Sequence, residues 1–317
     1  MITKSLGLVF PGQGSQSVGM LHDVAGEFPE VKDTFIEASQ SLGYDLWQLV
    51  QHGPAEELDK TVHTQPALLT ASYAIWRILK SKKNIQPVML AGHSLGEYTA
   101  LVCSNAMAFS DAVRLVAARG EYMQDAAPAG KGALAAIVGL DDAVVESICE
   151  KAKLENEVLS PANFNSPGQV VIAGHKMAVE RALVLAKESG ARLAKLLPVS
   201  VPSHCTLMKP AAERLSKLLE QISIQKPTLP VISNVDVTVY DTPDAIRVGL
   251  TRQLFMPVRW VETIQTFSKE RISCIVECGP GKVLTGLNKR IAPEIPLTNT
   301  ADLASLQSLL ESAFENQ

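Results

Sequence analysis

The stretch Gly92–Gly96 reads Gly-His-Ser-Leu-Gly, and it lies between a short apolar run and a segment that can continue as a helix. A strand, then Gly-x-Ser-x-Gly, then a helix is the arrangement of a nucleophile elbow. Because the glycines have no Cβ, the chain can turn sharply and the helix can pack close to the strand. Ser94 would stand at the tip of this turn, and the backbone N–H of Leu95 would face the same cleft from a helix N-terminus. The motif is equally compatible with a tight turn that has an incidental serine, so other segments must decide.

The composition is that of a globular protein. The chain has 317 residues, of which 46% are hydrophobic and 20% are charged, enough for one large core or two domains. Its net charge of −4 gives no reason to expect a nucleic acid partner. The apolar runs are far shorter than the roughly 18 residues of a membrane helix, and the first residues lack the apolar region of a signal peptide. We expect a cytoplasmic protein that binds neither nucleic acid nor membrane.

The cysteines and histidines do not form a metal-binding pattern. An odd number of cysteines, scattered along a chain of this size, is typical of reduced thiols. Cys274 and Cys278 have no second pair with which to form a zinc site. The six histidines do not cluster in the sequence either. We therefore expect no metal and no cofactor.

Short apolar strands alternate with helical patterns along the chain. The runs Leu6–Phe10 and Val231–Asn234 read as strands. Gly12 and Gly14 resemble the start of a dinucleotide fingerprint, but Ser17 stands where the third glycine is required. The alternation predicts an α/β fold with a mostly parallel sheet, covered by helices on both faces.

The segment between residues 130 and 199 has a different order of predicted strands and helices from the rest of the chain. It reads strand, helix, strand, strand, helix, strand, which is the ferredoxin-like βαββαβ arrangement. The ends of such a unit lie near each other, so it suits insertion into a larger domain. We predict a large α/β-hydrolase-like domain formed by residues 1–129 and 200–317, with a small ferredoxin-like domain inserted at 130–199.

An arginine lies on the apolar face of a helix predicted from Ser110, its expected N-cap, to about Asp125. Arg119 follows Val116 by three positions and precedes Met123 by four, so it shares their apolar stripe. An arginine facing a core cannot lose its charge and needs an anionic partner or a polar cleft. Arg119 therefore fits either a salt bridge within the fold or a site for the carboxylate of a substrate.

A serine hydroxyl is a poor nucleophile until a base removes its proton. His93 adjoins Ser94, but the side chains of adjacent residues at an elbow diverge. His204 follows an extended Val-Pro-Ser segment, where the chain returns to the predicted large domain. His204 is therefore the candidate base.

Six segments carry a shared pattern: 10–16, 92–97, 163–169, 201–204, 253 with 257–258, and 277–281. Together and in this order, they resemble the bacterial malonyl-CoA:acyl carrier protein transacylases of type II fatty acid synthesis. The resemblance extends from the first predicted strand to about Arg290. Cys278 and Met256 depart from patterns found in the family, and neither has a catalytic role there.

The resemblance implies a ping-pong acyl transfer. Ser94 would take a malonyl group from malonyl-CoA and pass it to the phosphopantetheine thiol of an acyl carrier protein. His204 would be the base, oriented by a backbone carbonyl near Gln253 and not by an aspartate. The expected partners are malonyl-CoA and acyl carrier protein, and we expect a monomer.

The same resemblance assigns the groups that bind the acyl unit. The backbone N–H groups of Gln13 and Leu95 would form the oxyanion hole. Arg119 would pair with the free carboxylate of the malonyl group.

Three rival functions remain. A serine esterase or thioesterase shares the elbow, but it has no need of Arg119 on an apolar face and normally has an acidic triad member. A non-catalytic scaffold for acyl groups or carrier proteins would not need both Ser94 and His204. A related acyltransferase could select a branched or unsubstituted acyl group. Arg119 favours a carboxylated unit but does not exclude methylmalonyl.

Overall fold

The computed structural model describes residues 5–127, 130–198 and 201–312. Within these residues, four strands form a parallel sheet in the order β2-β1-β7-β8. The sheet pairs Phe10 with Gly92, so the end of its first strand lies beside the Gly-x-Ser-x-Gly turn. Its strands are β1 (Leu6–Phe10), β2 (Met89–Gly92), β7 (Cys274–Glu277) and β8 (Leu297–Asn299).

Thirteen further elements surround this sheet in the described part of the chain. They are α1 (His22–Glu27), α2 (Pro29–Leu42), α3 (Leu46–His52), α4 (Ala55–Leu58), α5 (Thr61–Lys83), α6 (Gly96–Cys103), α7 (Phe109–Ala126), the 3-10 helix η1 (Thr206–Met208), α10 (Lys209–Leu219), α11 (Pro243–Gln253), α12 (Trp260–Lys269), α13 (Val283–Ile291) and α14 (Leu303–Glu311).

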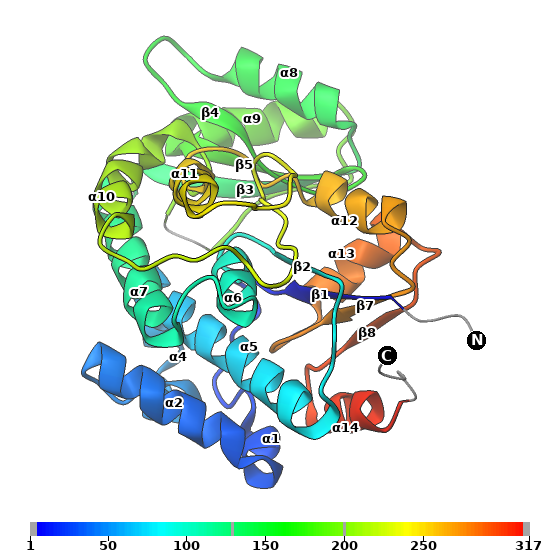
Figure 1. Cartoon of the computed structure of the whole chain (residues 1–317). Coiled ribbons are helices and arrows are strands. Elements are labelled where there is room, and N and C mark those ends of the chain that lie inside the picture. Colours follow the sequence, from blue (N-terminus) through cyan, green and yellow to red (C-terminus); the bar gives the residue numbers. More distant parts are fainter. Residues whose placement is uncertain (1–4, 128–129, 199–200, 313–317) are drawn as a thin grey trace.

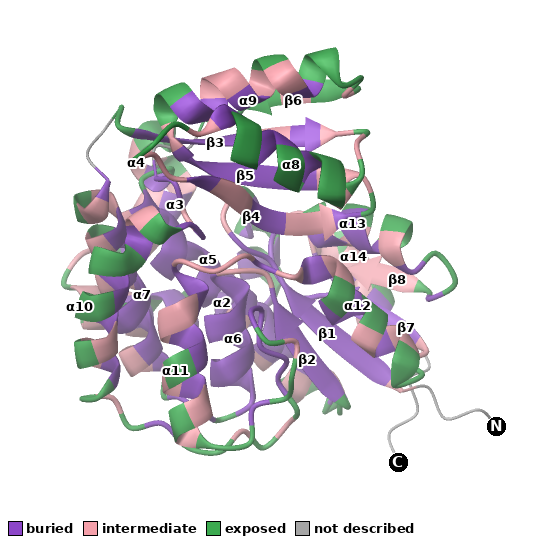
Figure 2. Ribbon diagram, turned by 90° about the horizontal axis from the view of Figure 1, so that it is seen from above, coloured by how far each residue is buried: buried purple, intermediate pink, exposed green. Residues whose placement is uncertain are grey.

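Strands β1, β2 and β7 of the parallel sheet are buried on both faces, as Figure 2 shows, whereas the edge strand β8 is half-buried. Side chains alternate across a strand, so Leu8 and Phe10 join one apolar core while Val9 joins another. The first core includes residues of α2, α5, α6, α7 and α10, and the second includes residues of α12 and α13. The expected parallel sheet with helices on both faces is confirmed.

A second, antiparallel sheet has the order β4-β5-β3-β6. Helices α8 and α9 pack on it and on each other, in the green region at the top of Figure 1. Of the positions that flank the predicted domain boundaries, residues 129, 199 and 200 lie outside the described residues. The elements of this region are β3 (Gly132–Val138), α8 (Asp142–Ala152), β4 (Leu159–Ser166), β5 (Gln169–His175), α9 (Lys176–Glu188) and β6 (Leu193–Leu196).

Two local predictions were wrong. Val231–Asn234 is not a strand and makes only isolated bridges, because the chain turns back at Ser233, whose N–H bonds to the carbonyl of Thr238. Ser110 is not an N-cap, since α7 begins one residue earlier and has no side-chain cap. Phe109, at the first position of the helix, is buried.

In the described part of the chain, all five cysteines are buried. None of the helices in this part of the chain is long and apolar enough to cross a membrane. The same residues hold no group of three or more His, Cys, Asp or Glu side chains that could bind a metal ion.

Helices α5 and α7 meet at Gly120, where the close approach leaves no room for a side chain. A Cβ at this position would lie 2.7 Å from the carbonyl oxygen of Thr61 and from the Cα of Val62. Gly120→Ala should therefore lower the free energy of unfolding by about 1–3 kcal/mol, measured by urea denaturation. Gly286→Ala is the matched control, because Gly286 is also helical but a Cβ there would have no neighbour within 4 Å. The free energy of unfolding of the control should rise by up to about 1 kcal/mol. Equal stability of the two variants would contradict the prediction.

Candidate active site

Ser94 occupies the sharp turn between β2 and α6, with a φ of 50° in the left-handed region. The flanking glycines are required by close backbone contacts. A Cβ on Gly92 would lie 1.8 Å from the carbonyl carbon of Gly96, and one on Gly96 would lie 2.1 Å from the carbonyl oxygen of Phe10. The N–H of Ser94 donates to Oδ1 of Asn234 at 2.7 Å. The turn thus fixes the backbone of Ser94 and leaves its hydroxyl directed into a cavity.

His204 lies within hydrogen-bonding distance of the serine. Its Nε2 is 2.8 Å from Oγ of Ser94, and its Nδ1 is 2.7 Å from the backbone carbonyl of Gln253. Because a carbonyl only accepts, Nδ1 carries the proton and Nε2 is free to accept the serine proton. Burial and the nearby charge of Arg119 lower the pKa of His204 to about 3. The imidazole is therefore neutral at physiological pH, as a general base must be.

Arg119 is 1% exposed and points to the same place from α7. Its Nη1 donates to Oε1 of Gln65 at 2.9 Å, and its Nη2 donates to Oε1 of Gln253 at 2.9 Å. Nη2 also lies 3.3 Å from Oγ of Ser94. Among the described residues, Arg119 has no carboxylate within ion-pair distance, and its Nε has no partner. The guanidinium is a buried cation held by neutral amides, and it lies beside the nucleophile candidate.

Gln13 and Leu95 line the cavity. In the described part of the chain, the backbone N–H of neither residue donates a hydrogen bond. The N–H of Ser94, by contrast, is already used by Asn234. Two donors without acceptors beside a serine hydroxyl can bind an oxyanion.

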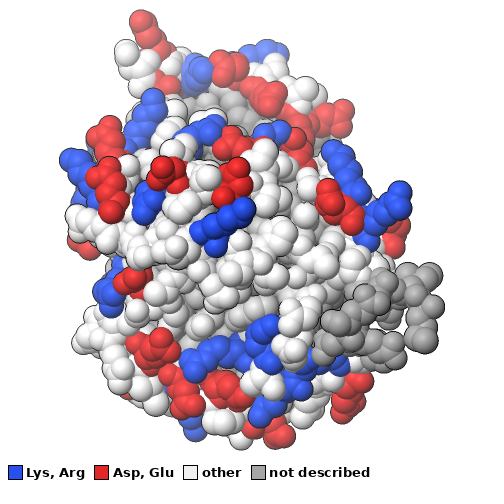
Figure 3. Space-filling model, viewed as in Figure 1, with Lys and Arg blue, Asp and Glu red and all other residues white. Residues whose placement is uncertain are grey.

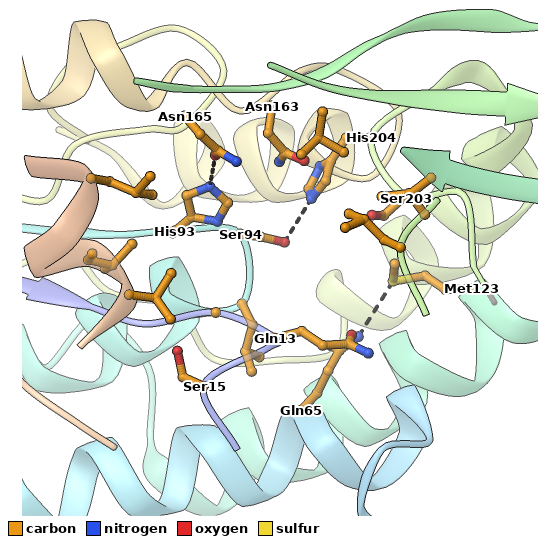
Figure 4. Close-up of a pocket in the computed structure, with 18 of the residues that line it drawn as sticks. Gln13, Ser15, Gln65, His93, Ser94, Met123, Asn163, Asn165, Ser203 and His204 are labelled. Atoms are coloured by element: carbon orange, nitrogen blue, oxygen red, sulfur yellow. Dashed lines mark hydrogen bonds between the residues drawn. The ribbon is translucent and has the colours of Figure 1, made fainter. Parts of the chain in front are cut away.

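A cavity of about 180 Å³ contains these groups. Figure 4 shows Ser94 and His204 pointing toward one another, with Gln13 and Gln65 across the cavity from them. Its walls come from both sheet regions, since Asn163 on β4 and Leu284 on α13 also line it. The predicted site residues are thus brought together: five of them line the cavity, and Gln253 contacts Arg119 and His204 from behind.

Comparisons with known proteins agree on one family. A family model described as an acyl transferase domain matches residues 8–294. A malonyl CoA-acyl carrier protein transacylase of Escherichia coli (strain K12) is 56% identical over 307 residues, which are 97% of this chain and 98% of the relative. The chain belongs to the malonyl CoA-acyl carrier protein transacylases.

Solved structures of transacylases have the same fold. The malonyl CoA-acyl carrier protein transacylase of Coxiella burnetii has 50% sequence identity and a TM-score of 0.97, and the match covers 99% of each chain. A type II PKS acyl-carrier protein in complex with its malonyl-transacylase gives 53% identity and a TM-score of 0.95, over 97% of this chain and 99% of that chain. The family resemblance expected from the sequence is therefore confirmed.

Sequence reasoning missed three polar residues around the site of this transacylase family member. Gln65 holds Arg119, and Asn234 holds Ser94 and donates through Nδ2 to the carbonyl of Gly92 at 2.6 Å. Glu97, at the first turn of α6, is wholly buried. Burial raises the pKa of Glu97 to about 7, although three hydrogen bonds and the charge of Arg119 act in the opposite direction. A signal for Glu97 was present, because it is an acid within an otherwise apolar helix.

The low pKa of His204 predicts a pH dependence of stability. The unfolded chain binds a proton on His204 near pH 6.5, whereas the folded chain does so only near pH 3. Between these values unfolding takes up a proton, so this contribution to stability is lost as the pH falls. Between pH 6 and pH 4, the free energy of unfolding of the wild type should fall with pH more steeply than that of His204→Asn. The difference in slope should be up to about 1.4 kcal/mol per pH unit, measured by urea denaturation. Parallel slopes for the two proteins would contradict the low pKa.

Proposed function

We propose that this protein transfers a malonyl group from malonyl-CoA to the phosphopantetheine thiol of an acyl carrier protein. The observation that carries the proposal is the 2.8 Å contact of Ser94 with His204, beside a buried Arg119 that has no carboxylate within ion-pair distance among the described residues. The names of the relatives, and the complex of a malonyl-transacylase with its carrier protein, support the choice of donor and acceptor.

The first half-reaction would form an ester. Nε2 of His204 accepts the proton of Ser94 as Oγ attacks the thioester carbonyl of malonyl-CoA. The negative charge on the carbonyl oxygen is bound by the N–H groups of Gln13 and Leu95, each worth about 10²–10³ in rate. The intermediate then expels the CoA thiolate, which takes the proton from His204, and malonyl-Ser94 remains.

The second half-reaction would run through the same groups in reverse. His204 deprotonates the phosphopantetheine thiol, the thiolate attacks the ester, and the hydroxyl of Ser94 regains its proton. This ping-pong order suits the site, because Ser94 and the base in contact with it, His204, line the same cavity, and each thiol can use them in turn.

Arg119 would select the malonyl group. Its two Nη groups face neutral amides, so a carboxylate entering the cavity would supply the missing negative charge. A charge-assisted hydrogen bond of about 1.5–3 kcal/mol corresponds to roughly 10–150-fold discrimination against acetyl. An esterase has no use for this buried cation, so the arrangement favours the transacylase over that rival.

We also propose the finer organisation of the chain. The order β3-α8-β4-β5-α9-β6 in an antiparallel sheet supports a ferredoxin-like domain at 130–199, inserted in an α/β-hydrolase-like domain of 1–129 and 200–317. One chain supplies both Ser94 and His204, which supports a monomer as the active unit. A cytoplasmic location would follow from the use of malonyl-CoA.

Docking of an acidic carrier protein would need a local basic patch, since the net charge of this chain is −4. On the face drawn in Figure 3, basic and acidic side chains are interspersed over the upper part of the molecule, and a broad uncharged area crosses the middle. Exposed basic residues of α9, β6 and α13, and of the loops beside them, are the candidates: Lys187, Arg192, Lys195, Lys282, Lys289 and Arg290.

Intact-mass measurement tests the proposed function. The protein is incubated with malonyl-CoA, and in parallel with acetyl-CoA. We expect a malonyl adduct of one group per chain that disappears when a holo acyl carrier protein is added. Absence of the adduct, or its release to water instead of to the carrier protein, would refute the transferase function.

A further inference from the structure

The side chain of Gln253 connects three parts of the site. Its Oε1 accepts from Nη2 of Arg119 at 2.9 Å. Its Nε2 donates to the carbonyl of Ser94 at 2.9 Å and to Oε2 of Glu97 at 2.6 Å. The amide thus has its oxygen toward a cation and its nitrogen toward two acceptors. Nothing in the proposed reaction uses this side chain, because only the backbone carbonyl of Gln253 meets His204.

Glu97 holds the far side of this amide. Its Oε1 accepts from the hydroxyl of Tyr240 at 2.5 Å, and its Oε2 accepts from Gln253 and from the N–H of Asn234 at 3.3 Å. The residue is wholly buried, and it does not line the cavity. Substrate therefore does not meet Glu97, and any effect on the reaction must pass through its neighbours.

An amide can be turned over, so that its oxygen and nitrogen exchange places. In the turned state, the oxygen of Gln253 would face the carboxylate of Glu97, and its NH₂ would face the guanidinium of Arg119. Acceptor would meet acceptor and donor would meet donor, at two buried positions. A charge-assisted bond from Gln253 to Glu97 stabilises the observed orientation.

We propose that Glu97 is a positioning residue for acyl selection: it orients the Gln253 amide, and the oriented amide holds the guanidinium of Arg119 beside Ser94. Two links carry the effect, the 2.6 Å bond from Gln253 to Glu97 and the 2.9 Å bond from Arg119 to Gln253. The inference rests on the proposed function, because it concerns the choice of malonyl over acetyl.

Two substitutions separate the reach of the Glu97 side chain from its charge. Glu97→Gln keeps the reach, since its amide oxygen can accept from Gln253 while its NH₂ donates to the hydroxyl of Tyr240. Glu97→Asp keeps the charge but is one methylene, about 1.5 Å, shorter. The 2.6 Å contact would then open to about 4 Å, beyond hydrogen-bonding distance.

The experiment measures loading of the intact chain by malonyl-CoA and by acetyl-CoA, with kcat and KM for each. The malonyl preference is the ratio of kcat/KM for malonyl-CoA to kcat/KM for acetyl-CoA. We expect this ratio to fall about tenfold in Glu97→Asp, through a higher KM for malonyl-CoA. Glu97→Gln should keep the preference within about threefold. A structural defect would instead lower loading by both substrates equally and would lower the melting temperature.

A third variant covers the case in which Glu97→Asp does not fold. Gln253→Met removes the amide but keeps the backbone carbonyl for His204, and it should lose the same malonyl preference as Glu97→Asp. The proposal is overturned if Glu97→Gln loses the preference, or if Gln253→Met or a folded Glu97→Asp keeps it. Failure of wild type to form a malonyl adduct would refute the proposed function instead, so the two failures are distinguishable.

Discussion

Replacing Ser94 by alanine is expected to abolish the malonyl adduct and to reduce transfer to the carrier protein by roughly 10⁴–10⁶-fold. The substitution removes Oγ, the atom that contacts Nε2 of His204 and would form the ester. His204→Ala should cause a loss of similar size, because the serine hydroxyl then has no base. The adduct is measured by intact mass and located by peptide mapping, and transfer is measured with holo carrier protein.

Ser216→Ala is the control for these variants. Ser216 lies on α10 and does not line the cavity, so the Ser216→Ala variant should form the adduct on Ser94 at the wild-type rate. A malonyl adduct of undiminished size on Ser94→Ala would mean that another residue is the nucleophile. Full activity of His204→Ala would remove the base from the mechanism.

The second large effect is expected for Arg119→Ala, in the choice between acyl groups. The substitution removes the cation beside Ser94 and should reduce malonyl loading about 10–150-fold more than acetyl loading. The reason is that an entering carboxylate would have to lose its water without gaining a charged partner. Steady-state loading rates with malonyl-CoA and acetyl-CoA measure the ratio directly.

Arg114→Ala is the matched control, since Arg114 is on the same helix but is exposed and paired with Asp111. It should change neither loading rate, because an exposed pair contributes little. An equal loss of malonyl and acetyl loading in Arg119→Ala would assign Arg119 a structural role and would remove the basis for carboxylate selection.

The parts of the site that could be predicted from the sequence are those encoded locally. The spacing of Gly92, Ser94 and Gly96 predicts the turn, because only glycine tolerates the contacts at its two ends. Helical periodicity places Arg119 on an apolar stripe, and the structure buries it there. These inferences need only the geometry of one strand end and one helix.

The remaining contacts join residues far apart in the chain. Gln253 is 156 residues from Glu97 and 134 from Arg119, and periodicity within an element carries no information on such pairs. The same limit explains the incorrect strand at Val231–Asn234. Its apolar residues are buried as a strand's would be, but a turn held by side-chain and backbone bonds of Ser233 interrupts the pairing.

The long separation between the proposed nucleophile, Ser94, and its proposed base, His204, has a consequence for biosynthesis. In the sequence, His204 lies 110 residues after Ser94, and Gln253 lies 159 residues after Ser94. At about 5–20 residues per second, a ribosome adds Gln253 roughly 8–30 s after Ser94. During that interval the serine is an ordinary alcohol, because the imidazole of His204 is made only after 110 residues and the carbonyl that fixes its tautomer only after 159. A nascent chain therefore cannot react with malonyl-CoA until the ribosome has completed the antiparallel sheet, whose strands lie between Ser94 and His204 in the sequence.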